Sequence, residues 1–178
     1  FKVAELVKKR YGFRMRKFNS KKEIKESGYI QKVLGVVNKA YANLYGYSEM
    51  DEEQMNTYAD LYLQFLDKRY LGVVENAEGE VIGMGVCITS LSRAVQKAKG
   101  KLFPFGWYHM LKALRAKQME AFDLLIIAVR PDYQDRGLNA VIIADQHPYF
   151  VKYGIKRVET TAILETNSKN QSHWELFP

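Results

Sequence analysis

Cysteine is almost absent from this sequence: Cys87 is the only one among 178 residues, and the three histidines lie in separate segments. A single cysteine excludes an intramolecular disulfide and a zinc site built from cysteines. The histidines do not have metal-ligand spacing, so no metal site is predicted. No run of about 18 apolar residues occurs, as a membrane-spanning helix needs. We therefore expect a soluble protein of the reducing cytoplasm, without a membrane partner.

The chain also lacks an initiating methionine and a signal peptide. We interpret it as a piece of a longer parent, with residues 1–12 as a linker helix from a preceding module and 13–178 as one domain. Hydrophobic residues make up 47% of the sequence and charged residues 26%, which is close to the globular average and excludes wholesale disorder. The length suits a single core.

Charge is unevenly distributed along the chain. Residues 1–25 carry ten basic and two acidic side chains, residues 46–80 are acid-rich, and residues 81–118 contain basic residues without any acid. Each basic cluster is compatible with a solvated helix face, with nucleic acid or with a coenzyme that carries several phosphates. No zinc-finger, RRM or KH signature accompanies the charge, so the sequence disfavours nucleic acid.

Hydrophobic periodicity and turn residues predict an α/β fold with a mixed sheet. Ser20, followed three residues later by Glu23, indicates a capped helix that runs to about Tyr45, and a second helix is expected to start near Ser48. Gly83 and Gly85 in the second hairpin strand indicate a bulge or a close backbone approach. The predicted elements are helix 3–11, strand 13–18, two helices up to residue 65, hairpin 69–91, a helical insert in 92–118, buried strand 122–131, helix 138–153, strand 157–164 and a helix after 168.

The most informative segment is 124–140, LLIIAVRPDYQDRGLNA, in which a buried strand leads through a glycine-containing loop directly into a helix. Main-chain N–H groups at a helix start have no partner within the helix, and the helix dipole favours an anion there. Gly137 permits close approach of a phosphate to the main chain, and Arg136 could add a charged contact. The alternative is an ordinary strand–loop–helix joint.

This segment resembles motif A of the GCN5-related N-acetyltransferases (GNAT), in which a strand ending V-x-P precedes Q/R-x-x-G-x-G/A. Gln134 and Gly137 match the motif, whereas Asn139 stands where the family has glycine or alanine. The order β-α-α-β-β-(helical insert)-β-α-β-α also agrees with the family. The resemblance implies a GNAT-like domain that stops before the family's last strands. The whole chain also resembles the C-terminal module of larger uncharacterised bacterial proteins.

The resemblance further implies binding of a CoA thioester, acetyl-CoA or a longer acyl-CoA, as substrate. The main chain of the buried strand would bind the pantetheine amides, and the loop would bind the pyrophosphate, with Arg130 or Arg136 on phosphate oxygens. A later asparagine of the family often contacts the coenzyme as well. The residues implied in coenzyme binding are Ala128, Val129, Gln134, Asp135, Arg136, Gly137, Leu138, Asn139 and Asn167.

The implied reaction is attack of an amine acceptor, unidentified by the sequence, on the acyl thioester, which needs a base and an acid. Glu165 is the first candidate for the base, with Glu159 and His173 as further candidates. The family's acid is often a tyrosine seven residues after the asparagine, but Trp174 occupies that position. The alternative is a catalytically degenerate module that serves as a scaffold, contacting a second module of its parent chain or another copy of itself.

Two aromatic groups remain. The segment that contains Phe103, Phe105, Trp107 and Tyr108 could line an acyl or acceptor pocket, but we expect a hydrophobic cover packed on the sheet, because aromatic residues bury large areas. The second group is Tyr41, Tyr45 and Tyr47, in a region where family members often recognise the acceptor; simple packing is the favoured interpretation.

Overall fold

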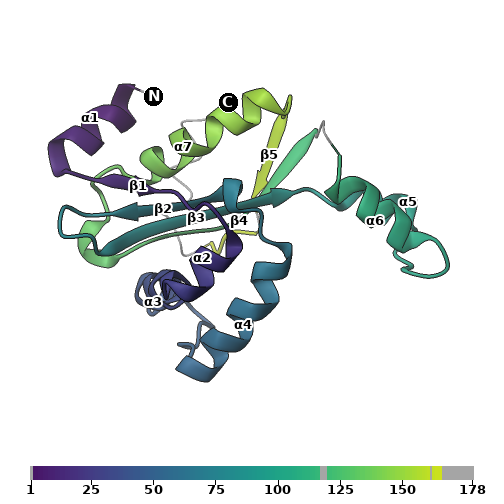
Figure 1. Cartoon of the computed structure of the whole chain (residues 1–178), viewed down its shortest axis with the longest axis horizontal. Coiled ribbons are helices and arrows are strands. Elements are labelled where there is room, and N and C mark those ends of the chain that lie inside the picture. The colour runs from purple at the N-terminus through teal and green to yellow at the C-terminus, as the bar shows by residue number, and fades with distance from the viewer. Residues whose placement is uncertain (1, 117–119, 161, 166–178) are drawn as a thin grey trace.

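The computed structural model describes residues 2–116, 120–160 and 162–165, and these residues form an α/β fold built on one mixed sheet (Figure 1). The strands follow the order β1-β2-β3-β4-β5, antiparallel throughout except for the parallel pair β4–β5. The elements are α1 (Lys2–Tyr11), β1 (Arg14–Arg16), α2 (Lys21–Glu26), α3 (Tyr29–Tyr41), α4 (Glu52–Phe65), β2 (Leu71–Glu75), β3 (Val81–Thr89), α5 (Ser92–Lys97), α6 (Gly106–Leu114), β4 (Ala121–Val129), α7 (Leu138–Lys152) and β5 (Arg157–Thr160).

Helices cover both faces of the sheet, with α1 and α7 on one face and α2, α3 and α4 on the other (Figure 1). Because side chains alternate along a strand, the neighbours Val73 and Val74 enter different cores. Val73 packs in the cluster that includes α3, whereas Val74 packs with Ile142 of α7. The predicted fold class and the mixed sheet are confirmed, and the expected last helix lies outside the described residues.

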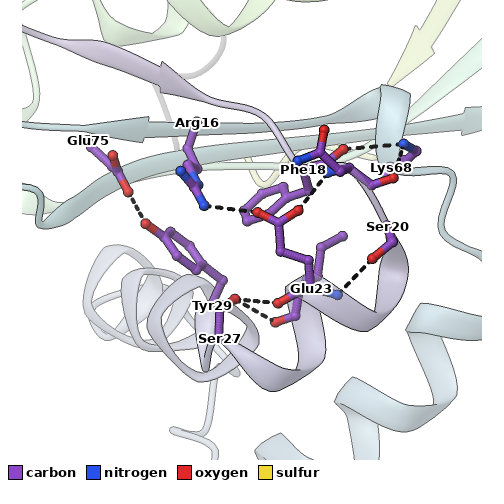
Figure 2. Close-up of polar contacts among 10 residues, drawn as sticks. Arg16, Phe18, Ser20, Glu23, Ser27, Tyr29, Lys68 and Glu75 are labelled. Atoms are coloured by element: carbon purple, nitrogen blue, oxygen red, sulfur yellow. Dashed lines mark hydrogen bonds and ion pairs between the residues drawn. The ribbon is translucent and has the colours of Figure 1, made fainter.

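The helix predicted from Ser20 to about Tyr45 is in fact two helices, broken at Gly28, whose φ of 69° lies in the left-handed region. The Ser20 hydroxyl does cap α2, accepting a hydrogen bond from the Glu23 N–H at 3.0 Å. The Glu23 carboxylate accepts from Arg16 at 2.9 Å, and the Tyr29 hydroxyl at the start of α3 donates to Glu75 of β2 (Figure 2). These contacts hold both short helices against the sheet.

Two further boundaries differ from the prediction. Helix α4 begins after Asp51 rather than near Ser48, because Asp51 and Gln54 form a reciprocal capping box. Strand β5 ends at Thr160, so residues 162–164 of the predicted strand lie outside it. Among the described residues, pairing of β5 with β4 therefore ends at Leu124 and Thr160.

The two glycines of β3 confirm the predicted close backbone approach. A Cβ atom at Gly85 would lie 2.5 Å from Cγ2 of Ile142, and one at Gly83 would lie 3.2 Å from Cδ2 of Leu138. Helix α7 therefore lies directly on the main chain of β3. This packing fixes the distance between the sheet and the first turn of α7, which begins at Leu138.

The helical insert between β3 and β4 does not cover the sheet, so that expectation was wrong. Helices α5 and α6 pack on each other beyond the end of the sheet (Figure 1). Phe103 and Phe105 are 75% and 71% exposed. No residue of this insert belongs to the core clusters that the described residues form.

Candidate functional site

The second half of strand β4 has an edge, called here the open edge, with which no described residue pairs. Strand β5 pairs with Ala121 to Leu124 of β4, and among the described residues this pairing stops there. A β-bulge coincides with this point, because Leu124 faces Cys87 whereas Ile126 faces Val86, which leaves Leu125 as the extra residue. The two strands therefore diverge after Leu124, and the main chain of residues 125–129 lies along a gap.

The register shows which main-chain groups face this gap. Opposite residues of an antiparallel pair alternate between exchanging hydrogen bonds and directing their polar groups away. The Arg130 N–H donates to the carbonyl of Ile82, the opposite residue, at 2.9 Å. By alternation, the polar main-chain groups of Ala128 face β3, whereas those of Val129 and Ile127 face the open edge. Sequence analysis named Val129 and missed Ile127, because only the register distinguishes neighbouring residues.

Side chains already reach this edge from two sides. The Tyr41 hydroxyl of α3 donates to the carbonyl of Ile127 at 2.9 Å, and the Gln134 amide donates to the carbonyl of Val129 at 3.3 Å. Burial raises the pKa of Tyr41 to about 12, so its phenol is a neutral hydrogen-bond donor at physiological pH. Tyr47 packs edge-on against the Tyr41 ring and itself donates to Asn38 at 2.6 Å. These contacts place Tyr41 beside the gap, so interpretation of the tyrosine as simple packing was incomplete.

The loop after β4 presents the start of α7 to solvent. The N-cap residue is Gly137, with φ of 80°, and no side chain caps the helix. Asp135 also has a positive φ, 62°, which turns the chain sharply between Gln134 and the helix. Residues 135–137 are exposed, whereas the Leu138 side chain is buried against β3. Leu138 therefore holds the start of α7 against β3, while the residues just before it are exposed to solvent; the first N–H groups have no partner within the helix, and the positive end of its dipole lies here.

Arginines and tyrosines alternate around this loop. The guanidinium of Arg136 lies 4.7 Å from the ring centre of Tyr133 and 5.8 Å from that of Tyr11 in α1. The guanidinium of Arg130 also lies 4.7 Å from the ring centre of Tyr133. Asp132 accepts two hydrogen bonds from Arg130, both at 2.8 Å, and this contact raises the pKa of Arg130 and lowers that of Asp132. Arg130, one of the two arginines proposed for phosphate contact, is thus already paired with the carboxylate of Asp132.

Helix α1 borders the same loop. A Cβ atom at Gly137 would lie 3.0 Å from Cγ2 of Val7, and a surface cavity of about 250 Å³ lies between α1 and the loop. Arg10 and Arg136 line it together with one acidic residue, Asp135, so the lining has a net positive formal charge. Its lining residues are Val3, Leu6, Val7, Arg10, Tyr11, Asp135, Arg136 and Gly137.

Two of the candidate acid–base residues, Glu159 and Glu165, lie within the part of the chain that the structure describes. Glu165 is exposed and lies beyond the end of β5, and Glu159 forms an ion pair with Arg157 at 2.9 Å. Asn167, His173 and Trp174 lie outside the described residues. Across residues 2–116, 120–160 and 162–165, no cluster of metal-ligating side chains is present, and no helix combines the length and apolarity that crossing a membrane requires.

Sequence comparison finds two relatives, and no family model matches the chain. A protein named bacterial ceramide synthase, from Caulobacter vibrioides (strain NA1000 / CB15N), is 25% identical over 142 residues, which cover 78% of this chain and 37% of that protein. Protein YghO of Escherichia coli (strain K12) is 27% identical over 139 residues, 75% of this chain and 35% of that protein. The chain therefore spans about a third of the length of the curated relatives it matches.

Solved structures share the fold of this chain at low sequence identity. The protein PH1933 from Pyrococcus horikoshii OT3 has a TM-score of 0.60 at 15% identity, covering 93% of this chain and 87% of that chain. The aminoglycoside N-acetyltransferase AAC(6')-Iy, crystallised with CoA, has a TM-score of 0.55 at 14% identity, covering 93% and 86%. Ard1 from Thermoplasma volcanium has a TM-score of 0.55 at 13% identity, covering 93% and 81%. The chain thus has the fold of the GCN5-related N-acetyltransferases, as its β4–α7 motif indicated.

Proposed function

We propose that this chain binds an acyl-CoA and transfers the acyl group to an amine. The observation that carries the proposal is the combination of an open β4 edge with an uncapped, outward-facing α7 N-terminus one short loop away. An extended pantetheine arm can bond to the edge as an added strand would, while the pyrophosphate occupies the helix start. Crystallisation of a protein of the same fold with CoA supports this assignment.

The main chain of β4 has a defined role in this proposal. The N–H groups of Ile127 and Val129 face the gap and are available to the pantetheine amide and the thioester carbonyl oxygen. The amine nitrogen attacks the thioester carbon, and negative charge develops on the oxygen, where a preorganised N–H stabilises it. The C–S bond then breaks, the nitrogen loses a proton to a base, and the departing thiolate gains a proton to become CoA.

Tyr41 is the proton donor that the geometry favours for the departing thiolate, because its neutral hydroxyl already lies at the Ile127 carbonyl. Tyr41 would then supply the general acid, because Trp174 stands at the position where the family often has its acidic tyrosine. Glu165 and His173 remain proposals for the base. The coenzyme contacts that the family resemblance implies for the loop also remain proposed, with Arg136 preferred over Arg130 for a phosphate because Asp132 already binds Arg130.

The acyl group and acceptor belong to the same proposal. The named product of the Caulobacter relative, ceramide, is an amide of a long-chain amine with a fatty acid, so we propose a long-chain acyl-CoA and a lipophilic amine as the first substrate pair to test. Acetyl-CoA is the comparison, since the fold neighbours include acetyltransferases. Residues 13–178 would then be the acyl-CoA module of a larger protein.

Calorimetric titration of CoA into wild type, Gly137→Ala and Gly154→Ala tests the coenzyme site. The two glycines lie at opposite ends of α7 with φ of 80° and 67°, so alanine costs similar backbone strain at both, about 1–2 kcal/mol. At Gly137 the added Cβ would also lie 3.0 Å from Cγ2 of Val7, whereas at Gly154 it would meet nothing within 4 Å, so urea unfolding of both variants accompanies the titration. Of the two variants, only Gly137→Ala adds its methyl group in the loop proposed to bind the phosphate. We expect a loss of affinity of roughly tenfold or more in Gly137→Ala, and near wild-type affinity in Gly154→Ala.

A degenerate scaffold is the second candidate, favoured by Asn139, whose side chain stands at a motif position that the family keeps small. It predicts no measurable binding of CoA, acetyl-CoA or long-chain acyl-CoA by the wild-type chain. Binding without turnover of any amine would instead support a coenzyme-binding module that has lost catalysis. Equal affinity in both glycine variants would place the coenzyme elsewhere.

A further inference from the structure

The α5–α6 insert exposes apolar side chains that belong to none of the core clusters formed by the described residues. Among residues 92–114, only Ala94 and Gly106 are buried within these two helices. Trp107, Leu111 and Leu114 recur at i, i+4 and i+7, so they form one stripe along α6, and each is at least 39% exposed. Phe103 and Phe105 precede α6 in the loop and are more exposed still.

The exposed aromatic side chains are held in place by the insert itself. The Trp107 indole N–H donates to the carbonyl of Pro104 at 2.9 Å, while 45% of the residue stays exposed. A Cβ atom at Gly106 would lie 1.8 Å from the carbonyl oxygen of Lys101, so the loop crosses the start of α6 in close contact. The aromatic surface is therefore presented by a packed loop and helix that lie beyond the end of the sheet (Figure 1).

The charge around this stripe has one sign. Residues 91–116 contain six basic side chains and no acidic one: Arg93, Lys97, Lys99, Lys101, Lys112 and Arg115. Lys112 and Arg115 follow Tyr108 at i+4 and i+7, which places them on the helix face next to the apolar stripe. Arg93 is paired with Glu120, whereas the four lysines are exposed.

From this combination we propose that the α5–α6 insert docks the protein on an anionic phospholipid surface. Trp, Phe and Leu beside Lys and Arg is the composition of helices that lie in a membrane interface, where aromatic rings enter the headgroup layer and cations meet lipid phosphates. A protein partner is less well matched, because lysine is depleted in protein–protein interfaces and four of the six cations are lysines. The inference concerns contact with the surface of a membrane rather than a span, and it requires no coenzyme.

Vesicle sedimentation without CoA tests the proposal at about 0.1 M salt. Wild type should bind phosphatidylcholine vesicles that contain about 30% phosphatidylglycerol, and bind pure phosphatidylcholine far more weakly. The triple variant Lys99→Glu, Lys101→Glu and Lys112→Glu should lose at least about 100-fold in affinity, since each cation near the surface contributes about a factor of five and each new carboxylate is repelled by the anionic lipid. Its matched control reverses the same number of exposed charges elsewhere, at Lys2, Lys9 and Arg14, and should lose only a few-fold.

The aromatic contribution has its own variant and control. Phe103→Ser with Phe105→Ser removes exposed rings without changing the charge, and should weaken binding by roughly tenfold or more. Tyr45→Ser removes a side chain that is 89% exposed on another part of the molecule and should have no effect. Of the two tryptophans, Trp174 is replaced by phenylalanine so that Trp107 alone reports, and its emission should shift to the blue with anionic vesicles.

Four results would overturn the proposal. They are absent vesicle binding by wild type, equal binding to neutral and anionic vesicles, equal loss in the insert and control charge variants, or an unshifted Trp107 emission. A dimer that dissociates in Phe103→Ser with Phe105→Ser, measured by analytical ultracentrifugation without lipid, would assign the surface to a second copy instead. Salt-sensitive RNA binding that competes with the vesicles and depends on the same lysines would assign it to nucleic acid.

Discussion

Replacing Gly85 by alanine should destabilise the protein through lack of space alone. The added Cβ would lie 2.5 Å from Cγ2 of Ile142, well inside van der Waals contact. Ile142 is 1% exposed, and its β-branched side chain has little rotamer freedom in a helix. Either α7 or β3 must therefore shift, and overpacking of this kind costs about 1–3 kcal/mol of unfolding free energy.

A double-mutant cycle isolates this contact. Ile142→Ala alone should cost about 2–5 kcal/mol, because it leaves a cavity between α7 and the sheet. The double variant Gly85→Ala with Ile142→Ala should cost less than the sum of the single variants, by about 1–3 kcal/mol, because the added methyl group then enters the vacated space. Urea unfolding followed by circular dichroism measures all four free energies.

Gly35→Ala provides a control of opposite sign. Gly35 lies within α3, and a Cβ atom there would meet nothing within 4 Å, so alanine should stabilise the protein by about 0.5–1 kcal/mol through helix propensity. A neutral or stabilising Gly85→Ala, or strict additivity in the cycle, would refute the close packing of α7 on β3. The position assigned to the α7 N-terminus would then lose its support.

Three further predictions follow from single contacts. Tyr41→Phe should lower the rate of acyl transfer roughly tenfold or more in steady-state kinetics and leave CoA affinity unchanged in calorimetry. Tyr47→Phe should change the rate little, because the Tyr47 hydroxyl donates to Asn38 rather than to β4. Equal rates in both variants would exclude Tyr41 as the acid. Asp51→Ala should lower the unfolding free energy in urea by about 0.5–2 kcal/mol, since the N-cap of α4 is lost. Ser48→Ala should stay within about 0.5 kcal/mol of wild type. A larger loss in Ser48→Ala than in Asp51→Ala would support the helix start near Ser48 that the sequence predicted. Burial raises the pKa of Cys87 from 9.0 to about 12, so the folded state keeps the thiol proton to a higher pH than the unfolded state. The contribution of this thiol to the unfolding free energy is fully present below about pH 9 and should fall as the pH rises, by about 2–3 kcal/mol at about pH 11. Cys87→Ala should lack that part of the loss, and parallel pH profiles of the variant and wild type would contradict the raised pKa.

The sequence predicted those parts of the fold that depend on local chemistry. Gly137 before an apolar segment indicated a helix start at about Leu138, and the structure places Gly137 at the N-cap with a positive φ. The paired glycines of β3 indicated close approach of another element, and α7 makes that approach. In both cases one residue type carries the information, because glycine alone permits the backbone conformation or the distance.

The remaining features depend on contacts between distant segments. Tyr41 and Ile127 are 86 residues apart, and nothing near either residue predicts their hydrogen bond. The break at Gly28 was missed because apolar spacing on both sides still follows a helical period. The bulge at Leu125 depends on which residue of β3 faces which residue of β4, so an unbroken apolar run could not show it.

The central claim is that CoA lies along the open β4 edge with its pyrophosphate at the start of α7. Amide chemical-shift mapping by NMR of the ¹⁵N-labelled chain, titrated in parallel with CoA and with phosphate-free pantetheine, tests it most directly. We expect CoA to shift the amides of Ile127, Val129, Gly137 and Leu138, and pantetheine to shift only the two on β4. CoA-induced shifts confined to other segments, or none at saturating CoA, would contradict the account.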